Sequence, residues 1–152
     1  MVLVHRIDEL TDRFRAEGLR VTPQRQALST LLESNDGHPT VEALHNAARV
    51  TMPTLSLKTV YQTVHDLAAM GEVELLDLGT GSVRVDPNVD HPHHHLICTG
   101  CGAVRDVPAD GAPPDLAPGW RDEFEVAAVE VNFRGRCGNC RARDPLTNSK
   151  TK

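Results

Sequence analysis

The chain has 152 residues, which is enough for one mid-sized domain or two small ones. Hydrophobic residues make up 39% and charged residues 24%, as is usual for a globular protein, and aromatic residues make up only 3%. The formal net charge is −5 and basic and acidic side chains are nearly balanced even in residues 1–70, which excludes a broad basic surface and leaves any nucleic-acid contact to a few placed cations.

Four helices are expected in the first 70 residues. Apolar residues recur at helical spacing from Ile7 to Phe14, and Gly18 follows as a stop signal. Each of the next three helices follows a hydroxyl side chain that can cap its N-terminus; these are Thr22, Thr40 and Ser56. In the fourth helix, the predicted buried stripe is Val60, Val64, Leu67 and Met70.

The hydrophobic period changes from helical to alternating after residue 72. Residues 73, 75, 83 and 85 are apolar and alternate with polar positions on either side of Gly79-Thr80-Gly81, which predicts a β-hairpin. Helices followed directly by a two-stranded wing are typical of a winged helix-turn-helix, here over residues 1–86.

A second, smaller unit is predicted over residues 96–141, after a polar, histidine-rich bridge at residues 87–95. Its expected strands are "AVRDV" and "VAAVEVNF", separated by a proline-rich loop at residues 107–119. Residues 142–152 are polar and are expected to form a disordered tail. The predicted fold class is therefore α+β.

All four cysteines occur as two Cys-x-x-Cys pairs, each in a glycine-containing turn: Cys98, Cys101, Cys137 and Cys140. The N-terminal segment has no run long enough for a signal peptide and no segment approaches a membrane span, which favours a reducing cytoplasm and a metal over disulfides. A tetrahedral zinc ion needs four such ligands at about 2.3 Å. Alternatives are two free buried pairs or a redox dithiol, although neither pair has the strand-to-helix context of a redox motif.

The segment "HPHHHLIC" places several imidazoles beside the first cysteine pair. On an extended chain His93 and His95 share one face, and His94 points to the other. Further candidate ligands along the chain are His38, Asp86 and Asp106. Three imidazoles and two carboxylates suit Fe(II), Mn(II) or Zn(II), whereas the alternative is a solvated histidine-rich linker. The helical histidines, His5, His45 and His65, are interpreted as surface or packing residues.

Five segments in order carry a family resemblance: "GLRVTPQRQALSTLLES", "GHPTVEAL", "SLKTVYQTVHDLAAMGEV", "HHHLICTGCG" and "GRCGNC". Together they resemble the Fur superfamily of metal-dependent bacterial repressors, from about residue 10 to residue 140. The resemblance implies an N-terminal winged-helix DNA-binding domain (1–86), a hinge that contributes metal ligands (87–95) and a C-terminal α/β dimerisation domain (96–141).

The same resemblance implies two kinds of metal site and a set of DNA contacts. The four cysteines would hold structural Zn²⁺, and a regulatory Fe²⁺ or Mn²⁺ would bind His38, Asp86, His93, His95 and Asp106. The residues expected at DNA are Arg20, Arg25, Lys58, Thr59, Tyr61 and Gln62. The implied protein is a cytoplasmic homodimer that binds a double-stranded operator, with no membrane partner, no small organic substrate and no enzymatic activity.

The signal is less sharply indicated. Asp86 in "RVD" and Asp106 resemble the peroxide-sensing (PerR-type) branch, in which iron-bound peroxide oxidises a histidine ligand and DNA is released; iron-sensing (Fur-type) relatives more often carry glutamate at the first position. No cysteine lies outside the two pairs, which counts against a zinc sensor. An iron- or other-metal-availability sensor without peroxide chemistry is the alternative.

Several features depart from the family pattern or leave other interpretations open. No histidine follows His95, although many members have one in the last strand, so His91 and His94 are interpreted as spare or as a weak site. Separately, the proline-rich stretch "VPADGAPPDLAPGW" stands where a helix is common in the family, so the dimerisation domain is expected to be locally unusual there. Gln62 stands where arginine or asparagine is usual, although glutamine also pairs with adenine. Tyr61 could instead be a core residue. A zinc-dependent enzyme, or a structural zinc module that binds another protein, are the alternatives from other classes.

Overall fold

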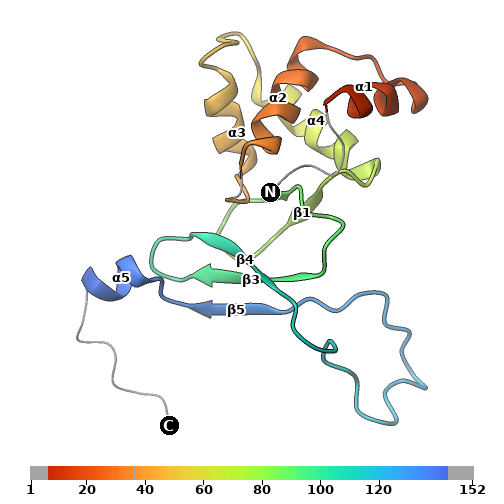
Figure 1. The fold of residues 1–152 in the computed structure, drawn as a ribbon, viewed down its shortest axis with the longest axis vertical. Coiled ribbons are helices and arrows are strands. Elements are labelled where there is room, and N and C mark those ends of the chain that lie inside the picture. Colours follow the sequence, from red (N-terminus) through yellow and green to blue (C-terminus); the bar gives the residue numbers. More distant parts are fainter. Residues whose placement is uncertain (1–6, 36, 144–152) are drawn as a thin grey trace. The chain divides into compact units, whose positions relative to one another are not determined.

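The computed structural model describes residues 7–35 and 37–143, and the chain divides into two compact units between His91 and Pro92. Within the described residues, the first unit contains four helices and a two-stranded sheet, and the second contains a three-stranded sheet and a short helix (Figure 1). Among these described helices, none is long and apolar enough to cross a membrane.

Three helices begin at the predicted caps. Helix α2 is Pro23–Glu33, α3 is Val41–Ala48 and α4 is Leu57–Ala69. The side-chain oxygens of Thr22, Thr40 and Ser56 accept backbone N–H groups from three residues further on, at 3.3, 3.0 and 3.1 Å. These bonds satisfy N–H groups that have no partner within the first turn of a helix.

Helix α1, Ile7–Ala16, ends at the predicted glycine. Gly18 adopts φ +69°, and its N–H donates to the carbonyl of Arg15 while the N–H of Leu19 donates to that of Phe14. This pair of bonds is a Schellman motif, which requires a left-handed residue that glycine adopts without strain. Leu19 packs against the same core cluster that contains Phe14.

The core of the first unit is mainly aliphatic, and it includes the predicted stripe of α4. Val60, Val64 and Leu67 are fully buried, while Met70 at the helix end is half-buried. The other members of the buried cluster are Leu10, Phe14, Leu28, Leu32, Val41, Leu44, Ala48, Leu55, Val73 and Val85. Because the last two come from the wing, the wing is packed onto the helices as part of one core.

The predicted hairpin is confirmed, although its strands are short. Strands β1, Glu74–Leu76, and β2, Arg84–Asp86, pair antiparallel with Leu75 opposite Val85. Val85 is buried and Leu75 half-buried, as the alternation predicts. Val83 is exposed instead, because it lies just before β2 in the connection that leaves the core.

A further segment of the first unit, residues 39–41, lies along β2. The N–H of Val85 donates to the carbonyl of Pro39 at 2.9 Å, and Thr40 forms an antiparallel bridge with Arg84. The residue that precedes this segment is His38, and the last residue of β2 is Asp86. The pairing therefore brings together two side chains that are far apart in sequence.

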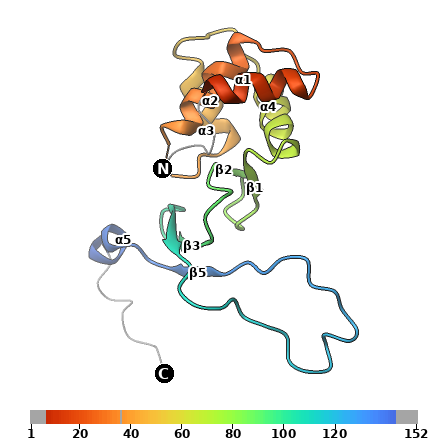
Figure 2. The ribbon, with the colours of Figure 1, turned by 45° about the vertical axis from the view of Figure 1, so that its right-hand side comes forward.

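The second unit is built on a central strand. Strand β3, His93–Cys98, pairs antiparallel with β4, Val104–Pro108, and parallel with β5, Asn132–Gly135, giving the order β4-β3-β5. Helix α5, Gly138–Arg143, follows β5. Figure 2 shows the long connection between β4 and β5 running away from the sheet.

The strand predicted over residues 126–133 is wrong for most of its length. Only residues 132–135 form β5, and residues 126–131 contain no strand. Alternation favours a strand only where a neighbouring strand offers hydrogen bonds, and β3 pairs with β5 only from His95 to Cys98. The predicted tail also begins too early, because residues 142 and 143 belong to α5; residues 144–152 lie outside the described residues.

Replacing Leu67 with alanine tests the core of the first unit. This side chain is fully buried on α4, so Leu67→Ala should lower the free energy of unfolding by about 2–5 kcal/mol through lost burial and a residual cavity. Urea unfolding followed by far-ultraviolet circular dichroism measures the change. The control is Val50→Ala at a position that is 82% exposed, where the change should stay within about 0.5 kcal/mol. Equal effects of the two variants would contradict this core.

Candidate metal centres and nucleic-acid interface

The two Cys-x-x-Cys pairs form one cluster within the second unit. Their sulfur atoms lie within 4.8 Å of one another, and the Sγ atoms of Cys101 and Cys137 are 3.9 Å apart. Tetrahedral zinc–sulfur bonds of about 2.3 Å place neighbouring sulfurs about 3.8 Å apart. The donor set and its spacing therefore fit a closed zinc site.

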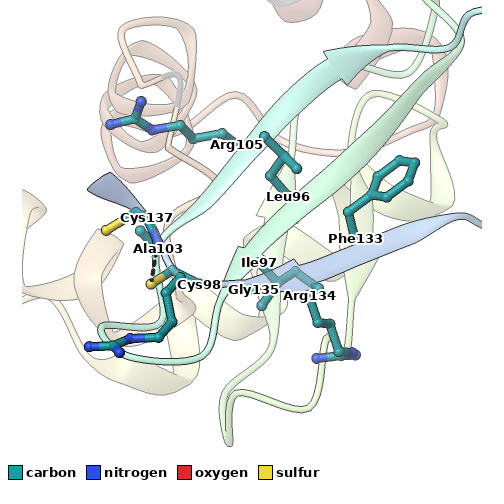
Figure 3. A pocket seen from close by; sticks show the side chains of 10 residues that line it. Leu96, Ile97, Cys98, Ala103, Arg105, Phe133, Arg134, Gly135 and Cys137 are labelled. Atoms are coloured by element: carbon teal, nitrogen blue, oxygen red, sulfur yellow. Dashed lines mark hydrogen bonds between the residues drawn. The ribbon is translucent and has the colours of Figure 1, made fainter. Parts of the chain in front are cut away.

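The sheet register brings the two pairs together. Cys98 ends β3 opposite Gly135 of β5, so the second motif starts beside the first. The N–H of Thr99 donates to the carbonyl of Gly135 at 2.7 Å. The N–H of Cys137 donates to the Sγ of Cys98 at 3.3 Å (Figure 3). The turn between β3 and β4 is closed by an N–H bond from Gly102 to the carbonyl of Cys98.

Cys98 and Cys140 of this cluster differ in acidity. Backbone N–H groups, that of Cys137 first, lower the pKa of Cys98 to about 6 because they stabilise the thiolate. The surrounding sulfurs, Cys137 first, raise the pKa of Cys140 to about 12. Deprotonation of Cys140 is thus disfavoured beside the other sulfurs, and a zinc ion held by the cluster would offset this cost with its positive charge.

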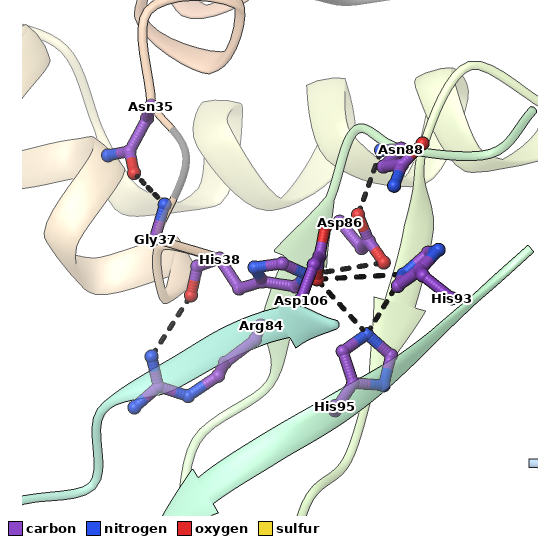
Figure 4. A network of polar contacts seen from close by, with 9 residues as sticks. All are labelled: Asn35, Gly37, His38, Arg84, Asp86, Asn88, His93, His95 and Asp106. Carbon is purple, nitrogen blue, oxygen red and sulfur yellow. Dashed lines mark hydrogen bonds and ion pairs between the residues drawn. The ribbon is translucent and has the colours of Figure 1, made fainter. Parts of the chain in front are cut away.

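In the first unit, His38 and Asp86 form a buried polar pair. The Nε2 atom of His38 lies 3.3 Å from Oδ2 of Asp86, and both side chains are buried (Figure 4). Asp86 also accepts the N–H of Asn88 through Oδ1 at 2.8 Å, and Arg84 donates to the carbonyl of His38 at 3.0 Å. These contacts fix both groups in the unit's interior.

The backbone of His38 is strained. Its φ of +50° makes it the single non-glycine residue with a positive φ among the described residues. The left-handed conformation costs roughly 1–2 kcal/mol for a residue with a Cβ. The bridge of residues 39–41 to β2 and the Arg84 contact hold this conformation, and such strain is commonly concentrated at functional sites.

In the second unit, His93, His95 and Asp106 converge on one face of the sheet. The alternation predicted for β3 is confirmed: the Nε2 atoms of His93 and His95 are 3.2 Å apart, whereas His94 packs against the ring of Phe133. Asp106 on β4 is paired with His95 in the register. Its Oδ1 lies 3.6 Å from Nε2 of His93 and 3.8 Å from Nε2 of His95.

A groove in the first unit brings together five of the six residues predicted at DNA. It lies between the start of α2 and the start of α4, and its lining includes Arg20, Arg25, Lys58, Thr59 and Gln62. On α4 the exposed positions that follow Leu57, which is itself exposed, recur at spacings of four, three and four residues: Lys58, Gln62, His65 and Ala69. The groove therefore presents cations and amides to solvent beside a helix whose opposite face is buried.

Tyr61 is not among the lining residues of this groove. Its side chain is half-buried against the core, and its hydroxyl donates to Oε1 of Glu42 on α3 at 2.7 Å. This hydrogen bond lowers the pKa of Glu42 and raises the pKa of Tyr61. In this position Tyr61 links α4 to α3.

Residues 16–113 match the model of the Ferric uptake regulator family. The chain belongs to this family. It is 33% identical over 139 residues to the "Peroxide-responsive repressor PerR" of Staphylococcus epidermidis (strain ATCC 12228 / FDA PCI 1200), which covers 90% of this chain and 91% of the relative. The protein of the same name from Staphylococcus aureus (strain Mu50 / ATCC 700699) is also 33% identical, over 90% and 92% of the two chains.

Solved structures of regulators share the fold. The Helicobacter pylori ferric uptake regulator Fur superposes with a TM-score of 0.72 at 16% identity, over 93% of this chain and 97% of that one. A zinc-bound manganese uptake regulator gives 0.64 at 25% identity, over 86% and 98%. The predicted winged helix followed by a small α/β domain is thereby confirmed as the fold of the chain.

Some residues that shape these sites carry no distinct signal in the sequence. Gly100 lies against Cys140, and Arg84 and Asn88 hold the His38–Asp86 pair. These contacts depend on tertiary structure, so no sequence motif predicts them. Asp66 is a partial exception, because its position four residues after Gln62 on a helix predicts a side-chain pair.

Gly100→Ala tests the packing of the cysteine cluster. A Cβ at this position would lie 3.0 Å from Sγ and 3.1 Å from Cβ of Cys140, so the sulfur must shift. The variant should bind zinc roughly tenfold more weakly than the parent protein does. Competition with a chromogenic chelator measures this affinity. Gly138→Ala is the matched control in the second motif, because a Cβ there meets no described atom within 4 Å. Identical zinc retention by the two variants would show that Gly100 imposes no such constraint.

Proposed function

We propose that the protein is a homodimeric, metal-dependent transcriptional repressor that binds double-stranded DNA. The observation that carries the proposal is the incomplete ligand set within each unit: His38 and Asp86 in the first, and His93, His95 and Asp106 in the second. Neither set alone fills the coordination positions of Fe(II) or Mn(II). A metal that takes ligands from both sets would make the arrangement of the chain depend on metal concentration.

The cysteine cluster would serve a different purpose. Four thiolates complete a tetrahedral zinc ion, so no position remains for a substrate or a signal. Zinc bound to Cys98, Cys101, Cys137 and Cys140 would join the end of β3 to the start of α5 and stabilise the second unit. This function is structural.

The regulatory site would contain three imidazoles and two carboxylates. This nitrogen and oxygen donor set suits Fe(II) and Mn(II), and it lacks the soft thiolates that favour zinc at the cysteine cluster. The buried pair of His38 and Asp86 supports the same proposal, since a cation offsets the cost of burying a carboxylate. Bound metal would restrict the motion of the first unit relative to the second. DNA affinity would rise because a larger fraction of the protein would have a conformation that can bind DNA.

A second copy of the chain is the proposed partner of the exposed apolar face of the second unit. Leu96 of β3 and Phe133 of β5 are direct neighbours in the register and stand on one side of the sheet (Figure 3). Trp120 and Phe124, in the connection between β4 and β5, are also exposed, at 63% and 69%. An apolar surface of this kind is typical of a protein interface.

The groove between α2 and α4 is the proposed DNA-binding surface. Lys58 and Arg20 would neutralise phosphates, and the exposed face of α4 would enter the major groove, as in other helix-turn-helix proteins. Tyr61, whose hydroxyl donates to Glu42, would support the helix, and the predicted contact of Tyr61 with a base or a sugar remains part of the proposal. A repressor of this kind acts in the cytoplasm, without a membrane partner, a small organic substrate or catalytic turnover.

Peroxide is the proposed signal. The support is the 33% identity to peroxide-responsive repressors over 90% of the chain, together with aspartate at positions 86 and 106. Iron(II), when bound, supplies the chemistry that reduces hydrogen peroxide. One oxygen atom of the peroxide would be added to the imidazole of His38, His93 or His95. Loss of that ligand would release DNA. The second candidate is a sensor of iron or another metal without this chemistry.

His38→Ala tests the metal dependence of DNA binding. Zinc-containing dimer would first select duplexes from a random pool in the presence of Mn(II), and affinity for them would be measured by fluorescence anisotropy. Removal of Mn(II) or the His38→Ala substitution should weaken binding at least about tenfold, because the regulatory site loses its metal or a ligand. His91→Ala, outside both ligand sets, is the matched control and should bind as the parent does. DNA affinity that changes neither on removal of Mn(II) nor in His38→Ala would refute the proposal.

Peroxide sensing makes a separate prediction. Protein loaded anaerobically with Fe(II) and exposed to equimolar hydrogen peroxide should gain one oxygen atom on His38, His93 or His95 and lose its selected DNA. Protein loaded with Mn(II) should remain unmodified. Peptide mass spectrometry measures the oxidation. Unmodified histidines in protein that demonstrably contains Fe(II) would leave metal availability as the signal.

A further inference from the structure

The exposed face of α4 carries an amide whose orientation is set within the protein. The Nε2 atom of Gln62 donates to Oδ1 of Asp66 at 2.9 Å, one helical turn further on. An ionised carboxylate offers only acceptors, so the nitrogen of the Gln62 amide must face it. The amide oxygen is consequently directed away from Asp66.

Asp66 is itself fixed by Arg25. The other carboxylate oxygen, Oδ2, accepts from a guanidinium nitrogen of Arg25 at 2.5 Å, and both side chains are only 15% exposed. Arg25 also donates to the carbonyl of Arg20 at 2.5 Å and lies over the ring of Phe14, with 5.2 Å between the guanidinium carbon and the ring centroid. A cation held by these contacts is poorly placed to move to a phosphate, so it acts as an anchor for Asp66.

The chain of contacts runs from the interior of the first unit to the groove. Arg25 orients Asp66, and Asp66 orients Gln62, which is exposed and lines the groove with Lys58 and Thr59. The sequence interpretation of Gln62 as a reader of adenine left the direction of its amide free. In the structure one N–H is engaged by Asp66, while the oxygen and the second N–H remain available.

We propose that Asp66 is a specificity-determining residue that fixes the base preference of α4 through Gln62. The inference rests on the proposed DNA-binding function. An outward amide oxygen accepts from the exocyclic amine of adenine or cytosine in the major groove, and the second N–H can reach N7 of adenine. Guanine and thymine present only acceptors, which can meet the second N–H but not the outward oxygen. The position read by Gln62 should therefore prefer adenine, the base that engages both groups.

Asp66→Asn gives this proposal a directional test. Arg25 still requires an acceptor, so the amide oxygen of the new side chain should face the guanidinium and its nitrogen should face residue 62. The Gln62 amide must then turn its oxygen inward to accept that donor, and its nitrogen faces the groove. The preference at the same base position should shift from adenine toward guanine, which offers two acceptors, O6 and N7.

The experiment is selection from a random duplex pool by the full-length, zinc-containing protein with Mn(II), followed by sequencing. Gln62→Met, which has similar length and no hydrogen bond, identifies the base position that depends on Gln62 by loss of its preference. At that position the parent should favour adenine by about two- to tenfold, the range of one or two neutral hydrogen bonds. Asp66→Asn should abolish or reverse the preference.

Two further variants keep the test decisive. Asp66→Ala removes the acceptor that orients Gln62, so the amide is free to turn and the base preference should be lost even if Asp66→Asn unfolds. Asp12→Asn is the matched control, because Asp12 forms an exposed ion pair with Arg15 elsewhere in the same unit, and it should leave the preference as in the parent.

The outcomes separate two failures. A parent protein that enriches no duplex overturns the proposed DNA-binding function and this inference with it. If the parent enriches duplexes but folded Asp66→Asn or folded Asp66→Ala keeps the parental preference, only the inference is overturned.

Discussion

The burial of a histidine and an aspartate in the first unit is the constraint on which the proposed regulation depends. A carboxylate removed from water is costly unless opposite charge and hydrogen bonds compensate it. Asp86 receives one backbone N–H from Asn88 and lies beside the imidazole of His38. The backbone strain at His38 adds to the cost of this arrangement. The free energy of this arrangement is unfavourable in the protein alone and favourable when a cation is present. Such a site is suited to respond to metal.

The wing is what makes this pair possible. Residues 39–41 add to the edge of β2, so the turn before α3 and the end of the hairpin share one hydrogen-bond network. Val85, between these contacts, belongs to the same buried cluster as the helices. Ligand positions are thus tied to the core that also orients α4. In the second unit, the register of β3 and β4 performs the equivalent task for His95 and Asp106.

Much of this could be predicted from sequence because local chemistry determines it. The caps at Thr22, Thr40 and Ser56, the glycine end of α1 and the alternation of β3 all follow from residue type and spacing. The strand predicted from residue 126 failed because strand formation requires a partner that no local pattern reveals. Arg25 and Asp66 are 41 residues apart, so the ion pair between them could not be predicted from a local pattern either. Family resemblance supplied the ligand sets, and the structure adds the internal geometry of each.

One measurement tests most directly whether a single metal is shared by the two ligand sets. Zinc-containing protein would be titrated with Mn(II), and bound metal counted by electron paramagnetic resonance, for the parent, His38→Ala, His95→Ala and the double variant. A shared site predicts that each single substitution abolishes the same one equivalent of tight Mn(II) and that the double variant loses no more. Retention of that equivalent when either ligand set is disrupted, or the loss of a different equivalent in each variant, would contradict it.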